Sequence, residues 1–273
     1  MIIGINDHDK YLYHYTSTET AINFILKDHT LRFSPYTGTN DPKESKNWVF
    51  DVGTNENRDL GIYNSAELSE WLSKELKQNT RLICFSRDTP HLTGNHLADI
   101  FSRGFCKPRM WAQYANRHTG VCLVFNKQAL HEKITSQIGT TRDVMSGAVK
   151  YIDRGIVKDL WKDQEYLINV DELEHRGKTQ YAIDHLQTHY KKLFFEKMTD
   201  WKDESEWRWV VLCDSDEPLY LSFGGALSGI VFGEDTNKED KFKIVKLTKG
   251  QIFYQSLKWK NCSPWYDFGR QDY

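Results

Sequence analysis

The 273-residue sequence has few cysteines, and none of them forms a recognisable motif. The five are an odd number, widely spaced and never in a Cys-x-x-Cys arrangement. A disulfide framework and a structural zinc site are therefore not indicated. We expect a reduced cytosolic protein with buried thiols at Cys84, Cys106, Cys122, Cys213 and Cys262.

Long apolar runs are also missing. No window approaches the ~20 apolar residues of a membrane span, and the first residues lack the basic, apolar and small-residue order of a signal peptide. We therefore expect a soluble, cytoplasmic protein without a membrane partner.

Neither charge nor nucleotide motifs single out a function. The 36 Lys and Arg residues nearly balance 38 Asp and Glu residues, for a net charge of −2, so no global field attracts nucleic acid or anionic lipid. Gly-x-Gly-x-x-Gly, a Walker loop and clusters with metal-ligand spacing do not occur. Dehydrogenase, P-loop and zinc-enzyme functions are disfavoured, and we predict no metal site.

What the sequence does contain suits one large core. It is 39% hydrophobic and 14% aromatic, and without repeats or low-complexity linkers we expect a single elaborate domain over residues 1–273. The polar stretches 55–57 and 89–95 are the boundary candidates. Strand patterns outnumber helical ones without regular alternation, which predicts the α+β class with a mainly antiparallel sheet and peripheral helices.

Local patterns place the individual elements. Strands are predicted over residues 11–15, 31–36, 81–86, 121–125, 148–152, 219–223, 228–232 and 252–257. Helices are predicted directly after Thr16, over residues 65–77, 108–115 and 171–198, and from residue 236. Residues 87–107 are the best candidate for a mobile or insertion loop.

The first strand is predicted to end at the amino terminus of a helix. Thr16 and Glu19 have the spacing of a capping box, and free backbone N–H groups at such a terminus suit an anion such as a phosphate. His14 lies just before this junction. A lone histidine in a strand is more often structural than a ligand, and the position alone leaves both interpretations open.

Two carboxylates lead into a strand-like run near residue 207. In an extended chain Glu204, Glu206 and Arg208 share one face, and the alternate residues 207, 209 and 211 form the packed face. Because burying three charges is costly unless they are paired, we expect them to line a cleft or the surface. Taken alone, the stretch favours a surface ion pair of Glu206 and Arg208 on a half-exposed strand.

An aromatic helix is predicted in the middle of the chain. Pro108 lies in its first turn, and Met110, Trp111 and Tyr114 share one face. Such a stripe is usually core. It can also form the wall of a pocket, since large flat side chains stack on a planar ring.

Six short motifs together resemble a bacterial family of unknown function, domain-of-unknown-function family 2971. They are residues 12–15, 40–44, 84–86, 110–114, 118–123 and 204–208, in that family's order. The resemblance covers roughly residues 11–232 and implies no activity.

A second resemblance carries chemical content. The opening residues 13–17, the aromatic helix and the late glutamates are similar to the ADP-ribosyltransferase superfamily, which includes DNA-modifying toxins of bacterial defence systems. The resemblance implies a split sheet and NAD as the substrate. It assigns His14 to the adenosine ribose, Glu206 to the nicotinamide ribose and Glu204 to the acceptor side.

The same resemblance implies an aromatic residue stacked on the nicotinamide, which would be Tyr36, Trp111 or Tyr114. The residues expected to bind NAD are Tyr13, His14, Thr16, Ser34, Tyr36, Trp111, Tyr114 and Arg208.

Three functional hypotheses result. The first is an NAD-dependent ADP-ribosyltransferase or NAD glycohydrolase acting as a toxin or phage-defence effector, with a protein or nucleic acid as acceptor. The second is a non-catalytic recognition domain whose charged strand face binds a partner protein of a defence or toxin system. The third is a metal-dependent nuclease using Asp41, Glu44, Glu204 and Glu206.

Overall fold

The computed structural model describes residues 9–38, 41–95, 97–138, 144–154, 163–213 and 217–266. Its strands are β1 (Tyr11–Thr16), β2 (Thr30–Pro35), β3 (Asp51–Gly53), β4 (Thr80–Arg87), β5 (Val121–Asn126), β6 (Val144–Ala148), β7 (Lys150–Tyr151), β8 (Leu167–Asn169), β9 (Glu196–Lys197), β10 (Glu206–Leu212), β11 (Leu219–Ser222), β12 (Leu227–Phe232), β13 (Phe253–Lys260) and β14 (Ser263–Tyr266).

Its α-helices are α1 (Thr18–Thr20), α2 (Leu26–Asp28), α3 (Pro42–Ser45), α4 (Ser65–Gln78), α5 (Pro108–Tyr114), α6 (Lys127–Ile138), α7 (Val170–Arg176), α8 (Lys178–Phe194) and α9 (Lys238–Leu247). A π-helical stretch, η1 (Ala21–Ile25), joins α1 to α2, and the 3-10 turns used below are η2 (Tyr36–Gly38), η4 (Ile100–Ser102), η5 (Gly104–Cys106) and η8 (Thr199–Glu204).

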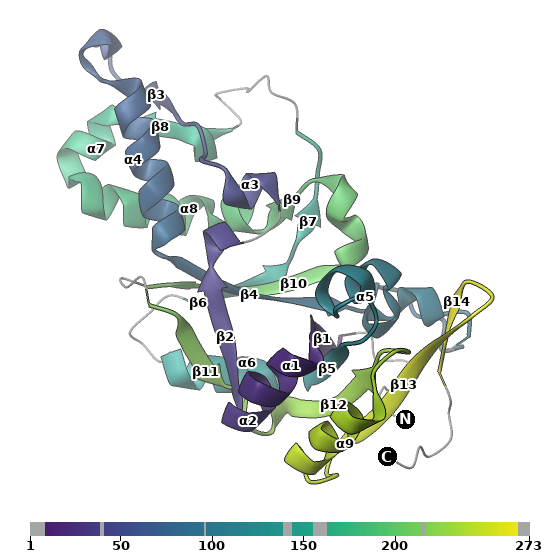
Figure 1. Cartoon of the computed structure of the whole chain (residues 1–273). Helices are drawn as coiled ribbons and strands as arrows, with labels where there is room; N and C mark the ends of the chain where they lie inside the picture. The colour runs from purple at the N-terminus through teal and green to yellow at the C-terminus, as the bar shows by residue number, and fades with distance from the viewer. Residues whose placement is uncertain are drawn as a thin grey trace.

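The strands assemble around one large open sheet. Within the described residues it has ten strands in the order β11-β2-β4-β1-β5-β12-β13-β14, with β10 on β4 and β6 on β10. Every pairing in it is antiparallel except that of β12 with β13. The predicted α+β class with a mainly antiparallel sheet is confirmed (Figure 1).

The sheet divides at β4. One edge of this strand carries β10 along its length. The other edge carries β1 at its end, with Tyr13 opposite Ser86, and β2 at its beginning, with Ser34 opposite Leu82. Between these two short pairings β1 and β2 diverge. Residues 83–85 of β4 therefore face the gap between two strands.

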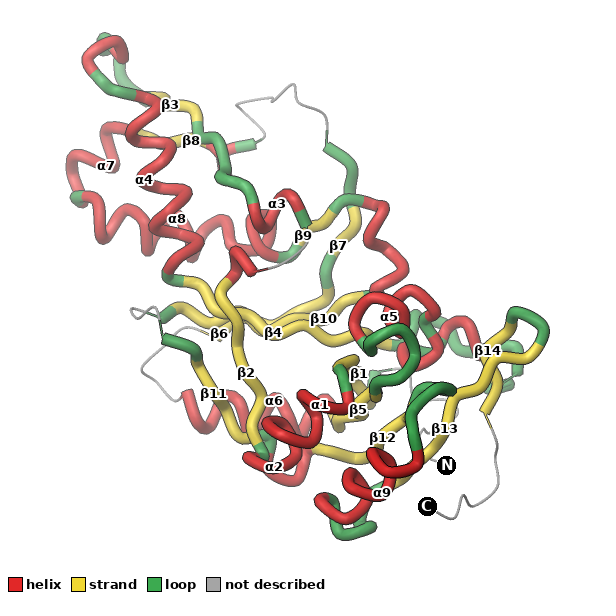
Figure 2. The backbone as a smooth tube through the Cα atoms, in the orientation of Figure 1, coloured by secondary structure: helices red, strands yellow, loops and turns green. Residues whose placement is uncertain are grey.

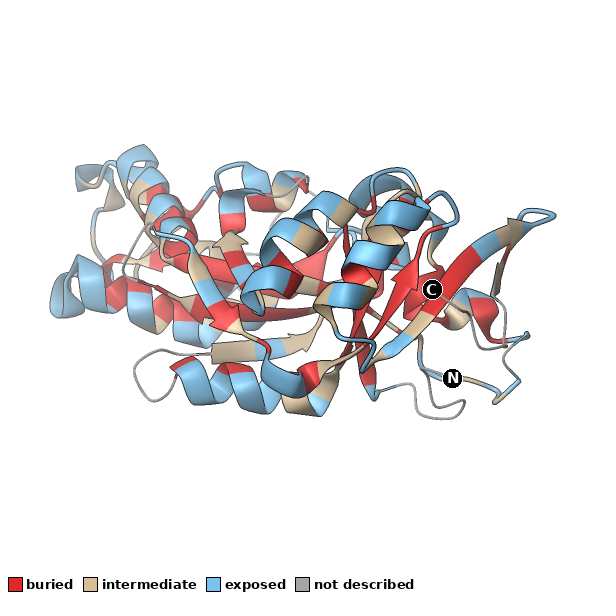
Figure 3. Ribbon diagram, turned by 60° about the horizontal axis from the view of Figure 1, so that its bottom comes forward, coloured by how far each residue is buried: buried red, intermediate tan, exposed pale blue. Residues whose placement is uncertain are grey.

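Helices cover both sides of this sheet (Figure 2). α4 and α8 lie on one side, over a core cluster that includes Trp48, Phe50, Leu72, Leu186 and Phe194. η1, α6 and α9 supply residues to a second cluster built on β4, β5 and β12. Buried residues follow the strands and the inward faces of the helices, whose outer faces are exposed (Figure 3).

The long helix predicted over residues 171–198 is wrong, because it breaks in the middle. α7 ends at Arg176, and the following Gly177 has a φ of +76°, a conformation that residues with side chains rarely adopt. The second part, α8, stops at Phe194, and the chain then forms β9, which pairs with β7. The end of α8 at Phe194 therefore leaves Lys197 on a strand rather than on a helix. Residues 148–152 likewise form no single strand, since β6 ends at Ala148 and β7 begins at Lys150.

The segment after β4 is packed rather than a plain loop. Apart from residue 96, residues 87–107 are described and include η4 and η5, with Ile100 and Phe105 buried. Asp88 fastens the segment to the sheet, because its carboxylate accepts hydrogen bonds from Gly104 N at 2.7 Å and from the Tyr13 hydroxyl at 3.2 Å.

The helix after β1 starts one residue later than predicted. Thr16 remains in β1, and Ser17 is the cap, its Oγ accepting a hydrogen bond from Thr20 N at 3.0 Å. The capping-box prediction for Thr16 and Glu19 is wrong.

All five cysteines are free thiols, but the expectation that they are all buried fails at Cys84, which is partly buried, and at Cys262, which is exposed. Among the described helices, none combines the length and the apolar character needed to cross a membrane.

Candidate functional site

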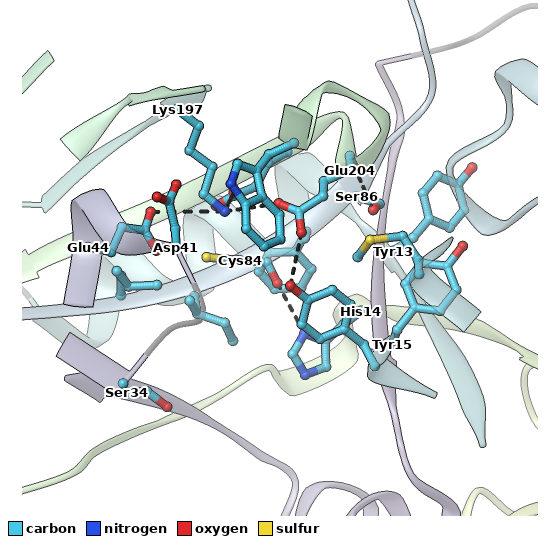
Figure 4. A pocket seen from close by; sticks show the side chains of 18 of the residues that line it. Tyr13, His14, Tyr15, Ser34, Asp41, Glu44, Cys84, Ser86, Lys197 and Glu204 are labelled. Carbon is cyan, nitrogen blue, oxygen red and sulfur yellow. Dashed lines mark hydrogen bonds and ion pairs between the residues drawn. The ribbon is translucent and has the colours of Figure 1, made fainter. Parts of the chain in front are cut away.

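A cavity of about 270 Å³ opens where β1 and β2 diverge from β4. β1 contributes residues 13–15 and β4 contributes residues 82–86, while α3, α5, β9 and η8 close the sides (Figure 4). Six of the ten predicted site residues line it, namely Tyr13, His14, Ser34, Tyr114, Glu204 and Glu206. Segments far apart in the sequence therefore converge on one cavity.

Lys197, which sequence reasoning missed, is the centre of the charged cluster in this cavity. Its Nζ lies 2.9 Å from Glu204 Oε2 and 2.9 Å from Glu206 Oε2. Glu44 Oε1 is farther away, at 4.0 Å. In the sequence, Lys197 follows Phe194, Phe195 and Glu196. This local pattern does not indicate that the lysine is buried.

Arg208 binds two carboxylates of the cluster, those of Glu206 and Glu44, but does not line the cavity. Its Nε donates to Glu206 Oε1 at 2.6 Å, and one terminal nitrogen donates to Glu206 Oε2 at 2.9 Å and to Glu44 Oε1 at 2.8 Å. The other donates to Phe194 O at 2.7 Å. The ion pair of Glu206 with Arg208 exists, but its predicted surface position is wrong, since these side chains are 3% and 0% exposed.

Opposite charges hold Glu206 and Lys197 ionised in this buried cluster. Burial alone would raise the pKa of Glu206, but the positive charges of Arg208 and Lys197 outweigh it and hold that pKa well below the usual range. Burial would likewise lower the pKa of Lys197, and the carboxylates of Glu206 and Glu44 raise it instead. Both residues are therefore charged at neutral pH.

Glu204 lines the cavity from a 3-10 turn, whereas the sequence pattern predicted that it lies in an extended strand. It ends η8, and Ser205 then turns the chain in the left-handed region with φ +47° before β10 begins. Its Oε1 accepts a hydrogen bond from the Tyr114 hydroxyl at 2.9 Å. The expectation that Glu204 shares an extended face with Glu206 is wrong, but both carboxylates meet at Lys197.

His14 occupies the gap in the sheet. Its Nδ1 lies 3.2 Å from Cys84 O, a β4 carbonyl. A carbonyl can only accept, so Nδ1 carries the proton and Nε2 remains a hydrogen-bond acceptor. Burial lowers the pKa of His14, although the bond to Cys84 opposes this effect. The imidazole is therefore neutral at pH 7.

Asp41 and Glu44 enter the cavity from α3. Asp41 caps this short helix, with Oδ1 accepting from Lys43 N at 2.9 Å. The helix is fixed by Lys77, whose buried Nζ donates to the carbonyls of Lys43 at 3.2 Å and Glu44 at 3.0 Å. Sequence reasoning considered these two carboxylates only as metal ligands. Among the described residues, no three His, Cys, Asp or Glu side chains are arranged to hold a metal ion.

The aromatic wall of the cavity differs from the predicted one. Tyr114 and Trp201 line it. Trp111 points into the core, where its ring packs on Tyr15 and its Nε1 donates to Phe105 O at 2.8 Å. Tyr36 is fully buried between Trp48 and Phe194.

Of the predicted NAD-binding residues, four do not line the cavity: Thr16, Tyr36, Trp111 and Arg208. The helical spacing of Trp111 and Tyr114 did not reveal which of them lines the cavity, because residues on one helical turn can face different surroundings. Trp111 and Tyr114 lie on the same short helix, yet one is core and the other is a third exposed.

Comparison with known proteins identifies a family over part of the chain. Residues 110–209 match the model of a family described as "Protein of unknown function (DUF2971)". The match includes Lys197, Glu204 and Glu206, so the resemblance to this family is confirmed there, whereas its extension to residues 11–232 stays a prediction. No curated protein and no solved structure matches the chain, and the resemblance to ADP-ribosyltransferases has no support from these comparisons.

Proposed function

We propose that the chain is an NAD-dependent ADP-ribosyltransferase or NAD glycohydrolase, and that its cavity holds the nicotinamide riboside half of NAD. The observation that carries this proposal is the convergence of His14 from β1 with Glu204 and Glu206 beside β10 in one cavity, together with Tyr114.

The electrostatics of the cavity suit cleavage of a glycosidic bond to nicotinamide. When the bond from C1′ to the ring nitrogen breaks, its electron pair leaves with nicotinamide and positive charge develops on the ribose. Five buried charged residues line this place, namely Asp41, Glu44, Glu204, Glu206 and Lys197. Arg208 contacts Glu44 and Glu206 without lining the cavity. At an effective dielectric of about 20, one carboxylate ~4 Å away contributes ~4 kcal/mol, roughly a thousandfold in rate.

The two glutamates have different roles in this proposal. Glu206 already accepts three hydrogen bonds or ion pairs from Arg208 and Lys197, so it fixes the two cations and supplies negative charge. Glu204 accepts one bond at each oxygen, from Tyr114 and Lys197, and keeps open lone pairs. It is the residue placed to take the proton of the attacking hydroxyl or water as a general base.

The size of the cavity suits half of the dinucleotide. Its volume of about 270 Å³ is just below the roughly 300–1,000 Å³ of pockets that enclose drug-sized ligands. Tyr114 and Trp201 provide flat side chains against which the nicotinamide ring can stack. The adenosine ribose would lie beside His14, to which the resemblance assigns it, and the rest of the adenosine half would extend beyond the cavity.

The burial of the charged cluster also separates this proposal from its alternatives. A recognition domain using the charged strand face would need Glu206 and Arg208 at the surface, and both are buried. A metal-dependent nuclease would need a cation to displace the ammonium group of Lys197 from Glu204 and Glu206. We therefore favour NAD chemistry over both.

Nicotinamide release from NAD by the purified protein tests the proposal, with and without a cell extract as the source of acceptor. We expect release by the wild type, little release by Glu206→Gln, and wild-type release by Glu70→Gln, which changes an exposed carboxylate on α4. No release by the folded wild type under either condition would refute the proposal. Release abolished by EDTA would instead favour a metal-dependent reaction.

A further inference from the structure

Two carboxylate oxygens at the cavity have no hydrogen-bond partner. They are Asp41 Oδ2 and Glu44 Oε2, which have no partner among the residues that the structure describes, and the two residues are 1% and 0% exposed. Buried acceptors are nearly always satisfied, and an unsatisfied one in a native protein calls for an explanation such as a ligand. Both residues line the cavity and approach its centre from the same helix (Figure 4).

The other oxygen of each carboxylate is firmly held. Asp41 Oδ1 caps α3, and Glu44 Oε1 accepts from Arg208 at 2.8 Å. α3 itself is tied to its surroundings by Lys43, whose Nζ donates to Lys192 O at 2.8 Å and to Glu196 O at 3.0 Å. The two free acceptors are thus held in place before any ligand arrives.

A donor lies beside these acceptors. The ammonium group of Lys197 has three N–H bonds, and it donates to Glu204 and sits against Glu206, each at 2.9 Å. Its distance to Glu44 Oε1, 4.0 Å, is too long for a hydrogen bond. Within the described part of the chain, one N–H of Lys197 therefore has no hydrogen-bond acceptor and remains for a ligand oxygen.

This combination selects for one kind of ligand group. Beside Asp41 Oδ2 and Glu44 Oε2, an anionic group would be repelled by these two carboxylates, and a cationic group would be repelled by the ammonium group of Lys197. A hydroxyl suits both, because it donates to a carboxylate and accepts from an ammonium group at the same time. We propose that Asp41 and Glu44 accept hydrogen bonds from the two vicinal hydroxyls of a ribosyl group, with Lys197 donating to one of them. This inference rests on the proposed function and names the contacts of its substrate.

Calorimetric titration with a probe that cannot be cleaved tests the inference separately from catalysis. The probe is benzamide riboside, in which a carbon–carbon bond joins ring and ribose, compared with its 2′-deoxy and 3′-deoxy analogues. For the wild type we expect each deoxy analogue to bind about tenfold to a hundredfold more weakly, as for hydrogen bonds to a charged group.

Two substitutions locate the contacts. Asp41→Asn keeps the capping oxygen, since Asn caps helices as well as Asp, and Glu44→Gln keeps the oxygen that Arg208 contacts. Each replaces the free acceptor with an N–H₂ donor. We expect each variant to bind the riboside about tenfold or more weakly, and to discriminate against one deoxy analogue by less than about threefold. Glu70→Gln is the matched control and should bind like the wild type.

The outcomes separate the inference from the proposed function. Equal binding of riboside and deoxy probes, no binding of any probe, or full discrimination in both variants would overturn the inference. Discrimination that is lost in Asp41→Asn supports it, even if the wild type releases no nicotinamide, a result that would refute only the NAD chemistry. Because Asp41→Asn preserves the cap, this variant alone decides if Glu44→Gln does not fold.

Discussion

Lys197 and Glu206 form the central contact of the cavity floor, with Nζ 2.9 Å from Oε2 and side chains 7% and 3% exposed. Both charges are almost fully buried, so each depends on the other and on their shared neighbours. Such pairs add little stability over an apolar core, but breaking one leaves an uncompensated buried charge. The contact therefore couples the stability of the fold to the chemistry of the cavity.

Replacing Lys197 with methionine should destabilise the protein strongly. Lys197→Met leaves Glu204 and Glu206 buried without their shared cation, and we expect a loss of about 3–5 kcal/mol in the free energy of unfolding, measured by urea denaturation. Lys191→Met, at an exposed position of α8, should change it by less than about 0.5 kcal/mol. Equal stability of the two variants would contradict the described cluster.

Substitutions of Glu204 and Glu206 should differ in how much they lower the free energy of unfolding. Glu206→Gln weakens the contacts with Arg208 and Lys197 and should cost about 3 kcal/mol. Glu204→Gln should cost only about 1–2 kcal/mol, because Lys197 keeps Glu206 as partner. Both should lower NAD turnover by about a hundredfold or more. The reverse order of stabilities in thermal and urea unfolding would show that the roles of the two residues are exchanged.

Substitutions of Tyr114 and Trp111, the aromatic residues of α5, should differ in their effects on the KM for NAD and on stability. Tyr114→Ala removes part of the cavity wall and the hydrogen bond to Glu204, so we expect a higher KM for NAD with a modest loss of stability. Trp111→Phe opens space in the core, where Trp111 is fully buried, and should cost roughly 1–3 kcal/mol with KM unchanged. A raised KM in Trp111→Phe alone would restore the sequence-based assignment of Trp111 to the nicotinamide ring.

A pH dependence of stability follows from His185, which is remote from the cavity. Burial, together with the neighbouring His189, lowers the pKa of His185 from its ordinary 6.5 to about 4. Between pH 6.5 and about pH 4, His185 is therefore unprotonated in the folded state and protonated in the unfolded chain. The stability is fully present above pH 6.5 and is lost as the pH falls toward 4, by about 3 kcal/mol for this residue.

His185→Gln tests that linkage, because Gln can still donate to Glu165 O, which His185 Nε2 contacts at 3.1 Å. Urea unfolding between pH 7 and pH 4 should show a decline in the variant that is about 3 kcal/mol smaller than in the wild type. Identical declines would mean that His185 titrates normally.

Most of the fold could be predicted from local patterns. The apolar runs of β4, β5 and β12 and the amphipathic spacing of α4 identify these elements, because burial on one or both faces leaves a periodic signature. The break at Gly177 and the turn at Ser205 were missed, since both depend on one backbone conformation that its sequence neighbourhood does not specify.

The candidate site could be predicted only in part. His14, Glu204 and Glu206 were found through the resemblance to ADP-ribosyltransferases, and the spacing of the charges in residues 204–208 alone favoured only a surface ion pair. Lys197 and the free oxygens of Asp41 and Glu44 were not found, since their roles depend on contacts between β9, η8 and α3 that no local pattern contains. Convergence of distant segments is a property of topology rather than of spacing.

The structure of the protein with a non-cleavable carbocyclic NAD analogue tests the central claim most directly. The account predicts the nicotinamide half in the cavity between β1 and β2, with its ring against Tyr114 or Trp201 and its ribose hydroxyls at Asp41 and Glu44. An analogue bound elsewhere on the molecule, or a cavity that stays free of it at saturating concentration, would contradict the account.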